Sequence, residues 1–232
     1  MNNENVVNKK MIPQHVAIVV DGNRRWTTER NLSIADGQKR AWDKIISSFD
    51  WFFLRRVKVV SYNVFPIEYW QRDEEENKNF FLAMQKAFAD NIKEFNKKDF
   101  KIIFSGRLFE LDNELQEFCS QIEQATRNNQ SGTANICLNY DGRCELMDAI
   151  KKIIRNNLTE EQIHEGIIKK YLYTQLPNPD IILRVGGLQH TGGFMFWQSA
   201  EAELMFLKKC WPDFEEFDVM KIIEEYNQRI QS

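Results

Sequence analysis

The stretch His15-Val16-Ala17-Ile18-Val19-Val20 runs directly into Asp21-Gly22-Asn23-Arg24-Arg25-Trp26. Its first half is almost wholly apolar and rich in β-branched residues, which is typical of a strand buried on both faces of a parallel sheet. Its second half begins with a carboxylate and a glycine and continues with two arginines, a composition typical of a loop. We therefore predict a central strand whose carboxyl end carries polar chemistry.

Further segments share the apolar, β-branched or aromatic character of this first strand. The predicted strands are His15–Val20, Val57–Val64, Phe100–Phe104, Ala134–Asn139, Asp180–Val185 and Ala202–Phe206. Amphipathic stretches lie between them, and the predicted helices are Gly37–Leu54, Glu74–Lys97, Glu110–Arg127, Arg143–Arg155, Glu160–Leu172 and Val219–Ile230. This alternation predicts an α/β fold in a single domain, with a central six-stranded, mostly parallel sheet surrounded by helices. Ligands of such sheets bind beyond the carboxyl ends of the strands.

Length and charge limit the classes of protein to which the chain can belong. It has 232 residues and a formal net charge of −3, so we expect one folded domain over residues 11–232 after a polar N-terminal tail over residues 1–10. The balanced charge lacks the basic stripe of a nucleic-acid-binding protein, so no nucleic-acid partner is expected. No apolar run approaches the roughly 18 residues of a membrane-spanning helix, and no signal peptide is visible. We therefore expect a cytoplasmic protein.

The loop that begins at Asp21 combines groups that can hold a metal-bound phosphate. Mg²⁺ is often bound by one or two carboxylates while it keeps waters and takes phosphate oxygens, and Asp21 supplies such a carboxylate. Gly22 would let backbone N–H groups approach a phosphate, and Arg24 and Arg25 add positive charge. An Asp-Gly turn followed by solvated arginines is the simpler interpretation, and the loop alone does not decide between the two.

Five motifs resemble the cis-prenyltransferase family, which includes undecaprenyl diphosphate synthases and isoprenyl transferases. They are His15–Trp26, Phe65–Arg72, Asn139–Arg143, Asp180–Gly187 with Phe194–Gln198 and Ala202–Leu204, and Trp211–Phe214. Their order and spacing match the family from about residue 11 to about residue 230. The resemblance implies a catalytic domain with a six-stranded parallel sheet, acting as a homodimer. It also implies Mg²⁺-dependent joining of an allylic isoprenoid diphosphate to isopentenyl diphosphate.

The resemblance assigns roles to the residues that match the motifs. It implies that Asp21 binds Mg²⁺ and that Asn23 takes part in catalysis beside it. It implies that Gly22, Asn23 and Arg25 bind the allylic diphosphate, and we expect Arg24 and Trp26, which lie in the same motif, to bind substrate as well. The loop near the reacting carbons would contribute the catalytic residues Glu68 and Trp70 and the substrate-binding Arg72. The second diphosphate site would contain Arg184, His190 and, as a metal or partner-subunit contact, Glu203.

Several departures from the family pattern fall in these same motifs. In the first site, Arg24 stands where the family usually has glycine, Ile34 replaces an arginine and Gln38 replaces a histidine. In the reacting loop, Pro66 and Ile67 replace serines and Tyr69 replaces an asparagine. In the second site, His190 replaces an arginine and Gly192 replaces a serine. Because several changes fall in one pocket, neutral drift explains them poorly.

These observations favour ionisation of a short allylic diphosphate with Mg²⁺ and prenyl transfer to a second isoprenoid, giving a short Z-prenyl, branched or cyclised product. The alternative is a single-substrate terpene synthase that uses the same fold. Long-chain undecaprenyl diphosphate synthesis and a non-catalytic partner subunit are less favoured. The acidic run Asp73-Glu74-Glu75-Glu76 is interpreted as a solvated helix cap, where carboxylates favour the helix dipole, and not as a metal motif.

Overall fold

Six strands form one sheet in which every pair of neighbouring strands is parallel. The computed structural model describes residues 11–231, so the predicted N-terminal tail lies outside the described residues. The strands are β1 (His15–Val19), β2 (Val59–Pro66), β3 (Phe100–Ser105), β4 (Gly132–Tyr140), β5 (Ile181–Arg184) and β6 (Glu203–Phe206). The predicted α/β class and the six predicted strands are confirmed. The sheet is wholly parallel, where the sequence predicted a mostly parallel one.

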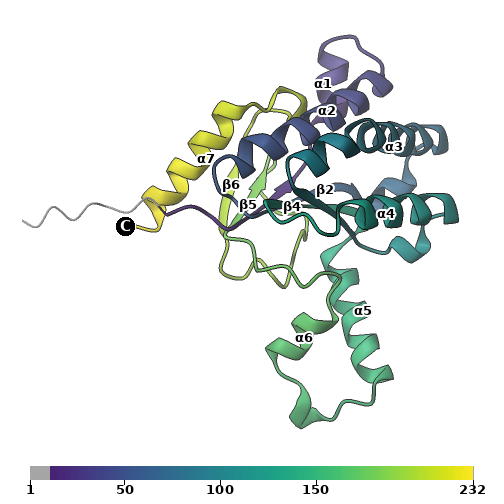
Figure 1. Ribbon diagram of the computed structural model, residues 1–232, viewed down its shortest axis with the longest axis vertical. Coiled ribbons are helices and arrows are strands. Elements are labelled where there is room, and N and C mark those ends of the chain that lie inside the picture. Colours follow the sequence, from purple (N-terminus) through teal and green to yellow (C-terminus); the bar gives the residue numbers. More distant parts are fainter. Residues whose placement is uncertain (1–10, 232) are drawn as a thin grey trace, which may run out of the picture.

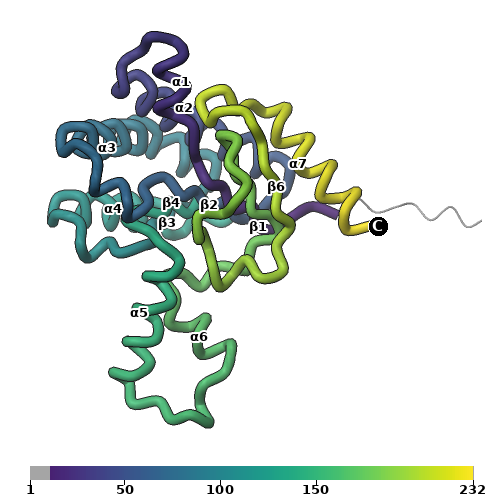
Figure 2. Tube along the Cα trace, turned by 180° about the vertical axis from the view of Figure 1, so that it is seen from behind, coloured from purple at the N-terminus to yellow at the C-terminus, as the bar shows by residue number. Residues whose placement is uncertain are grey.

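The described residues also form seven α-helices. They are α1 (Asn23–Glu29), α2 (Ile34–Phe53), α3 (Glu74–Lys97), α4 (Asn113–Thr126), α5 (Gly142–Arg155), α6 (Glu165–Tyr171) and α7 (Glu216–Arg229). The main core joins one face of the sheet to α2, α3, α4 and α7. Figure 1 shows α5 and α6 projecting as an arm, and Figure 2 shows the same arm from behind. Within residues 11–231, no helix is long and apolar enough to cross a membrane.

The position of β1 in the sheet determines where the site lies. The strand order is β3-β4-β2-β1-β5-β6, so β1 pairs with β2 on one side and with β5 on the other. The chain changes direction across the sheet between β1 and β5, which creates a crevice at the carboxyl ends of these strands. The residues that follow β1 and β5 therefore meet there, although they are about 160 positions apart in sequence.

The helix boundaries differ from the sequence prediction where local capping decides them. Helix α2 begins at Ile34, earlier than predicted, because Ser33 and Asp36 form a reciprocal capping box. Helix α4 begins at Asn113 because the Asp112 carboxylate accepts a hydrogen bond from the backbone N–H of Leu115 at 2.8 Å. The predicted helix Glu160–Leu172 is divided into a 3₁₀ turn and α6. The short helix α1 was not predicted.

Aromatic side chains fill the space between α2 and α3. The Trp42 ring lies 5.3 Å from the Phe80 ring and 5.8 Å from the Phe88 ring, and all three side chains are buried. Phe65 from β2 adds a ring 5.2 Å from Phe80. Each such pair contributes about 0.5–1.5 kcal/mol beyond the burial of its area. The packed rings leave little free volume beneath the carboxyl end of β2.

A buried histidine at the start of β1 makes stability dependent on pH. His15 is fully buried, its Nδ1–H donates to the Pro177 carbonyl at 2.7 Å, and its Nε2 accepts from the Ser61 hydroxyl at 2.8 Å. Burial lowers the pKa of His15 from 6.5 to about 4. Unfolded His15 therefore binds a proton at a higher pH than folded His15, and stability decreases as the pH falls below 6.5.

We predict that the His15 contribution lowers the free energy of unfolding by about 2 kcal/mol between pH 7 and pH 5. Urea denaturation of the wild type at both pH values measures the total decrease. A His15→Gln variant should lose this part of the decrease, whereas His164→Gln, at an exposed histidine, should keep it. An equal pH dependence in wild type and His15→Gln would contradict the assignment.

Candidate active site

A cleft of about 310 Å³ opens at the carboxyl ends of β1, β2, β4 and β5. It lies at the crevice that the strand order creates between β1 and β5. Its lining residues include Asp21, Asn63, Glu68, Tyr69, Arg72, Tyr140, Arg184, Leu188, Thr191 and Gly192. The cleft thus collects residues from four of the five motifs that the sequence analysis singled out.

Asp21 lies in this cleft directly after β1 and has two protein partners. Its Oδ1 accepts a hydrogen bond from the backbone N–H of Gly22 at 2.6 Å, and its Oδ2 accepts one from Arg184 Nη2 at 2.7 Å. About a quarter of the Asp21 side chain is exposed, against 9% of the Arg184 side chain. Strand register explains the pair, because Val19 on β1 lies opposite Arg184 on β5.

Gly22 is required by the backbone at this turn. Its φ of +89° lies in the left-handed region, and an added Cβ would meet the Cys210 sulfur at 2.7 Å. Any other residue would therefore push apart the β1 loop and the segment that contains Cys210. The tight approach keeps Asp21 at the mouth of the cleft.

The residues of α1 divide into exposed and structural groups. Arg25 is exposed and donates through Nη2 to the Gly186 carbonyl at 2.9 Å, which joins the loops after β1 and β5. Trp26 is buried, and its indole N–H donates to the Asp213 carboxylate at 2.7 Å. The side-chain oxygen of Asn23 is buried without a hydrogen-bond partner. Arg25 and Asn23 are therefore placed for a ligand, whereas Trp26 anchors α1.

Arg24 and Arg72 share the carboxylate of Glu76. Arg24 Nε lies 3.1 Å from Glu76 Oε1, a second Arg24 nitrogen pairs with Oε2, and Arg72 Nη1 lies 3.3 Å from Oε1. The hydrogen bond to Glu76 raises the pKa of Arg24. The Arg72 guanidinium also stacks on the Tyr69 ring at 3.0 Å, and burial raises the pKa of Tyr69.

The sequence interpretation of Glu76 as part of a solvated cap is therefore wrong. Asp73 caps α3, since its carboxylate accepts from the N–H groups of Glu75 and Glu76. The Glu76 side chain, in contrast, is only 7% exposed. The acidic run alone could not predict the burial of Glu76, because the arginines that pair with Glu76 come from α1 and from the segment before α3.

The second predicted diphosphate site centres on Arg184 and His190. Arg184 Nη1 lies 3.1 Å from His190 Nδ1 and 3.0 Å from the His190 carbonyl. The backbone N–H of Gly192 also donates to His190 Nδ1 at 3.1 Å. The Nε–H of Arg184 is buried and has no hydrogen-bond partner. This donor could be satisfied by an anionic ligand, since a buried unpaired donor is costly.

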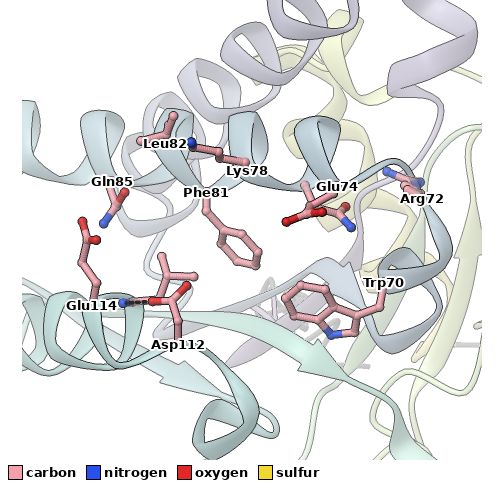
Figure 3. A pocket seen from close by; sticks show the side chains of 11 residues that line it. Trp70, Arg72, Glu74, Lys78, Phe81, Leu82, Gln85, Asp112 and Glu114 are labelled. Atoms are coloured by element: carbon pink, nitrogen blue, oxygen red, sulfur yellow. Dashed lines mark hydrogen bonds between the residues drawn. The ribbon is translucent and has the colours of Figure 1, made fainter.

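Glu68 and Trp70 lie on opposite sides of the 3₁₀ segment Ile67–Gln71. Glu68 is exposed and lines the cleft. Trp70 lies outside the cleft and lines a second cavity, between α3 and α4 (Figure 3). The structure therefore brings Glu68, but not Trp70, together with Asp21.

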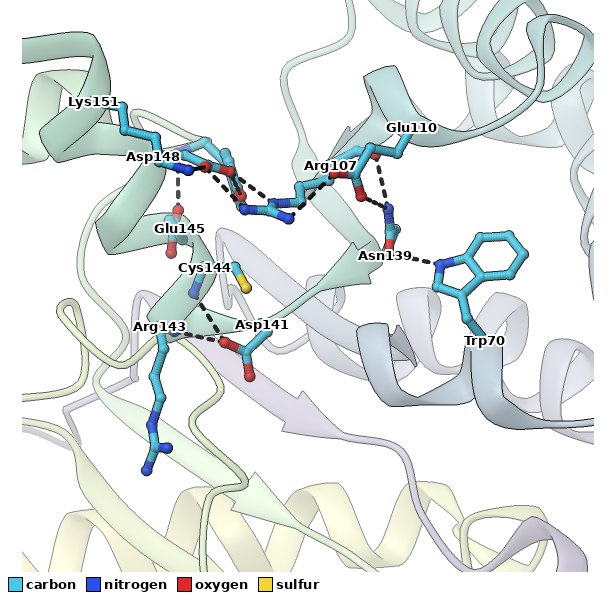
Figure 4. A network of polar contacts seen from close by, with 11 residues as sticks. Trp70, Arg107, Glu110, Asn139, Asp141, Arg143, Cys144, Glu145, Asp148 and Lys151 are labelled. Carbon is cyan, nitrogen blue, oxygen red and sulfur yellow. Dashed lines mark hydrogen bonds and ion pairs between the residues drawn. The ribbon is translucent and has the colours of Figure 1, made fainter.

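The indole of Trp70 begins a chain of polar contacts (Figure 4). Its Nε1–H donates to Asn139 Oδ1 at 2.8 Å, and Asn139 Nδ2 donates to Glu110 at 2.9 Å. Arg107 then joins Glu110 to Asp148 on α5 through ion pairs of 3.2 and 2.8 Å. The chain fixes the Ile67–Gln71 segment relative to α5.

A second buried group next to the cleft was not assigned from the sequence. Glu145 is 1% exposed and accepts hydrogen bonds from the Tyr140 hydroxyl at 2.5 Å, from Gln198 at 3.1 Å and from the Tyr173 backbone N–H at 2.8 Å. The Tyr140 hydroxyl accepts from the backbone N–H of Met195 at 3.2 Å. Burial, and then the neighbouring Glu145, raise the pKa of Tyr140.

This network holds the segment after His190 against β4. In the sequence, Tyr140 belongs to the Asn139–Arg143 motif, and the resemblance of that motif to the family is the feature that could have pointed to this network. Glu145 gave no signal, because its partners Tyr173 and Gln198 lie far away in sequence.

Glu203 is not brought together with Asp21 in this chain. Glu203 begins β6 opposite Ile181, whereas Phe206 lies opposite Arg184, so Glu203 lies about 10 Å along the strand from the cleft edge. Its carboxylate pairs with Arg229 on α7 at 3.0 Å. Over residues 11–231 there is no group of three or more His, Cys, Asp or Glu side chains that could hold a metal ion. Asp21 is the predicted metal ligand that lies in the cleft.

Comparisons with known proteins show the family to which this chain belongs. The family model described as "Putative undecaprenyl diphosphate synthase" matches residues 19–232. The chain is 34% identical over 221 residues to an isoprenyl transferase of Fusobacterium nucleatum, covering 95% of each. It is 31% identical over 234 residues to the tritrans,polycis-undecaprenyl-diphosphate synthase (geranylgeranyl-diphosphate specific) of Methanopyrus kandleri, covering 97% of this chain and 86% of that protein. The chain belongs to the cis-prenyltransferase family and is a prenyltransferase.

Solved structures share the same fold. Lavandulyl diphosphate synthase from Lavandula x intermedia, solved with dimethylallyl diphosphate, superposes with a TM-score of 0.87 at 24% identity, covering 93% of this chain and 95% of that chain. A probable undecaprenyl diphosphate synthase from Campylobacter jejuni superposes with a TM-score of 0.77 at 22% identity, covering 92% of this chain and 94% of that chain. The predicted family and architecture are confirmed.

Proposed function

We propose that this prenyltransferase ionises a short allylic isoprenoid diphosphate with Mg²⁺ and transfers the prenyl group to a second isoprenoid. The product is then a short Z-prenyl chain or an irregular, branched or cyclised one. The observation that carries the proposal is one cleft in which the Asp21 carboxylate lies with the cations Arg72 and Arg184. Such a set of charges suits a metal-bound diphosphate on which negative charge grows as the carbon–oxygen bond breaks.

The residues present fit a single Mg²⁺ ion. Asp21 offers a partly exposed carboxylate at a strand end, and Mg²⁺ commonly takes one or two carboxylates plus phosphate oxygens and waters. When bound, the ion would neutralise charge on the leaving diphosphate. In this proposal Glu203 does not complete the metal site within one chain, because it lies at the other edge of the sheet.

Protein groups on the α1 side would bind the first diphosphate. Asn23, Arg24 and Arg25 form the first turn of α1 directly after Asp21 and Gly22. Arg24 and Arg72 are both paired with Glu76. We propose that these groups orient the allylic diphosphate and stabilise its departure, with Glu68 facing the reacting carbons. Tyr69 stays protonated in this site because burial raises its pKa, so it cannot act as a base.

The interior beside the first site supports a short substrate. The cavity enclosed by α1, α2 and α3 is only about 30 Å³, far below the roughly 300–1,000 Å³ of pockets that hold small organic ligands. The Arg24–Glu76 ion pair lies on its wall, and the packed rings of Trp42 and Phe80 lie beneath it. A long polyprenyl chain has no room there, which disfavours undecaprenyl diphosphate synthesis.

A single-substrate terpene synthase remains the second candidate function. One observation favours the terpene synthase: Arg184 Nη1 already donates hydrogen bonds to His190 Nδ1 and to the His190 carbonyl. A guanidinium engaged in this way has fewer donors for a second diphosphate. The buried, unpaired Nε–H of Arg184 favours the two-substrate reaction.

We also propose that the enzyme is a cytoplasmic homodimer. An exposed apolar stripe on α5 supports the homodimer, since Met147, Ile150 and Ile154 are 48%, 46% and 67% exposed. Helix α5 belongs to the arm that projects in Figure 1. Residues spaced by three and four positions share a helix face. A second copy of the arm would cover such a stripe from water.

The decisive experiment compares one substrate with two. Purified protein with Mg²⁺ is incubated with dimethylallyl, geranyl or farnesyl diphosphate, each with and without isopentenyl diphosphate, and products are identified by mass spectrometry. We expect a short product that requires two isoprenoid diphosphates. Product from one allylic diphosphate alone would establish the terpene synthase, and a long polyprenyl product would overturn the proposed product class.

We predict that Asp21→Ala lowers kcat by about 10²–10⁴-fold, because the carboxylate that holds the metal is lost. Steady-state kinetics in Mg²⁺ measure the effect, and removal of Mg²⁺ with EDTA should act in the same way on the wild type. The matched control is Asp50→Ala, which removes a surface carboxylate paired with Lys98 at 2.7 Å. Near-normal Mg²⁺-dependent turnover by Asp21→Ala would rule out the proposed reaction.

We predict that His190→Arg tightens binding of isopentenyl diphosphate by roughly 10–150-fold, since a charged hydrogen bond contributes about 1.5–3 kcal/mol. Calorimetry in Mg²⁺, with dimethylallyl thiolodiphosphate as an unreactive allylic analogue, measures the dissociation constant. Gln189→Arg adds the same charge one residue away and serves as control. Gly192→Ser is avoided because Gly192 has a φ of +65° and an added Cβ would lie 3.1 Å from Arg184.

The His190→Arg result also tests the interpretation of the second site. An unchanged dissociation constant, or an equal gain in Gln189→Arg, would contradict the prediction. So would a wild-type enzyme that already binds isopentenyl diphosphate at low micromolar concentration and elongates with it.

A further inference from the structure

The 3₁₀ segment Ile67–Gln71 forms part of the cleft wall but has little packing of its own. Each of its five residues is at least partly exposed. Its Tyr69 carbonyl accepts a hydrogen bond from Asn77 Nδ2 at 3.0 Å, and its Trp70 indole N–H donates to Asn139 Oδ1 at 2.8 Å. The position of this part of the wall therefore depends on contacts that neighbouring elements supply.

Asn139, near the end of β4, has an irregular backbone. Its φ of +47° lies in the left-handed region, which is unfavourable for residues other than glycine and is tolerated best by asparagine and aspartate. The pairing of β2 with β4 also shifts register here, because Phe65 lies opposite Leu138 whereas Pro66 lies opposite Tyr140. Register shifts and strained backbone are frequent beside active sites, where they direct a side chain. In this protein they occur at the residue that binds the Trp70 indole.

The side-chain amide of Asn139 fits its surroundings in one orientation. Asn139 is fully buried, and its Nδ2 donates to the Arg107 carbonyl at 3.1 Å and to Glu110 Oε2 at 2.9 Å, while its Oδ1 accepts from Trp70. An indole N–H can only donate, whereas a carbonyl and a carboxylate accept. Exchange of the amide nitrogen and oxygen would therefore break all three hydrogen bonds. The amide thus fixes the direction of the indole.

The loop that follows β3 holds Asn139 in turn (Figure 4). The backbone N–H of Arg107 donates to the Asn139 carbonyl at 3.2 Å. Gly106 approaches β4 so closely that an added Cβ would lie 1.8 Å from the Leu138 carbonyl oxygen. The Arg107 guanidinium binds both carboxylate oxygens of Asp148 on α5, at 2.8 and 3.0 Å, and such a two-point contact fixes its orientation. The hydrogen bond to Trp70 therefore starts from a rigid part of the fold.

We propose that Asn139 is a positioning residue for prenyl transfer: through its hydrogen bond to Trp70 it sets the place of the Ile67–Gln71 segment, and hence of Glu68 in the cleft. The inference rests on the proposed function, in which Glu68 faces the reacting carbons. It also gives Trp70 a role in catalysis from outside the cleft. Trp70 acts through the segment that carries it and does not touch the substrate.

This role affects turnover more than binding of the first substrate. Arg72 and the Tyr69 carbonyl are held from α3, by Glu76 at 3.3 Å and by Asn77 at 3.0 Å. These contacts do not pass through Asn139, so they remain when its amide is removed. A displacement of about 1 Å at the reacting groups can cost about 10²-fold in rate.

The test removes each half of the hydrogen bond between Trp70 and Asn139. Asn139→Gly deletes the amide without adding strain, because glycine adopts a φ of +47° freely, and Trp70→Phe keeps an aromatic ring but lacks the N–H donor. We expect each variant to lower kcat by about 10–100-fold. The dissociation constant of dimethylallyl thiolodiphosphate, measured by calorimetry in Mg²⁺, should stay within about threefold of the wild-type value. The double variant should be no slower than the slower single variant, because both changes remove one interaction.

The matched control removes an amide far from the cleft. Asn129 Nδ2 donates to Asn96 Oδ1 at 3.0 Å and to the Phe100 carbonyl at 2.8 Å, at the amino end of β3. Asn129→Gly therefore deletes a structural asparagine at the opposite end of the sheet. We expect its kcat to equal that of the wild type.

A second pair of variants tests the network by restoring it. Asn139→Asp keeps an acceptor for the Trp70 N–H but places a carboxylate where the amide nitrogen lies 2.9 Å from Glu110, so repulsion should lower kcat. Adding Glu110→Gln returns an amide donor to this contact and should recover most of the loss. Glu110→Gln alone is the reference for the pair.

Three results would overturn the proposal. They are losses in kcat that multiply in the double variant of Trp70 and Asn139, a dissociation constant for dimethylallyl thiolodiphosphate that rises as much as kcat falls, and no recovery when Glu110→Gln is added to Asn139→Asp. Circular dichroism identifies a variant that does not fold, and the two sets of variants test the network independently.

Failure of the proposed function gives a different result. Turnover is measured with whichever isoprenoid diphosphates the wild type converts, so product from one allylic diphosphate alone would contradict the two-substrate function and leave the test of Asn139 intact. A wild-type protein that converts none of them would overturn both.

Discussion

The ion pair between Asp21 and Arg184 joins the two halves of the site. Parallel pairing of β1 with β5 places Val19 opposite Arg184, so the carboxylate that follows β1 meets the guanidinium at the end of β5 at 2.7 Å. The Arg184 side chain is nearly buried, and a buried charge that loses its partner is strongly destabilising. In the proposed reaction, Asp21 would hold the metal ion and Arg184 would bind the diphosphate, so that each of these two charges would keep a partner.

The same exchange applies to the cations on the other side of the cleft. Arg24 and Arg72 are paired with Glu76; Arg72 lines the cleft, whereas Arg24 lines the small cavity beside it. In the proposed reaction, a diphosphate in the cleft would compete with Glu76 for Arg72. Glu76 is nearly buried, and its backbone carbonyl accepts a hydrogen bond from Gln38 at 3.0 Å, so it is held in place while the arginines can turn. Glu76 thus keeps Arg24 and Arg72 paired beside the cleft. It also makes binding of the first substrate sensitive to the position of α3.

The sequence predicted the strands well and the connections less well. A parallel strand buried on both faces must be continuously apolar, which is why β1 was predicted as His15–Val20 and observed as His15–Val19. Helix α1 was missed because its seven residues are mostly polar and its position depends on contacts from Trp26 and Arg25 to distant segments. In the site, Asp21 was predicted from its place after a strand and from the family resemblance, and Arg184 from the resemblance alone. The burial of Glu76, the separation of Glu203 from Asp21 and the outward position of Trp70 depend on packing and strand register, which no local pattern contains.

The structure also changes the interpretation of His190. Arg184 and the backbone N–H of Gly192 can only donate, so His190 Nδ1 must accept both hydrogen bonds and the ring proton must lie on Nε2. A proton on Nδ1 would remove both hydrogen bonds. An arginine at this position would act as a second cation for a diphosphate, whereas His190 acts as an acceptor that orients Arg184. The replacement of arginine by histidine thus converts a substrate contact into a support for the neighbouring arginine, which is consistent with a second site that binds its diphosphate through fewer charges.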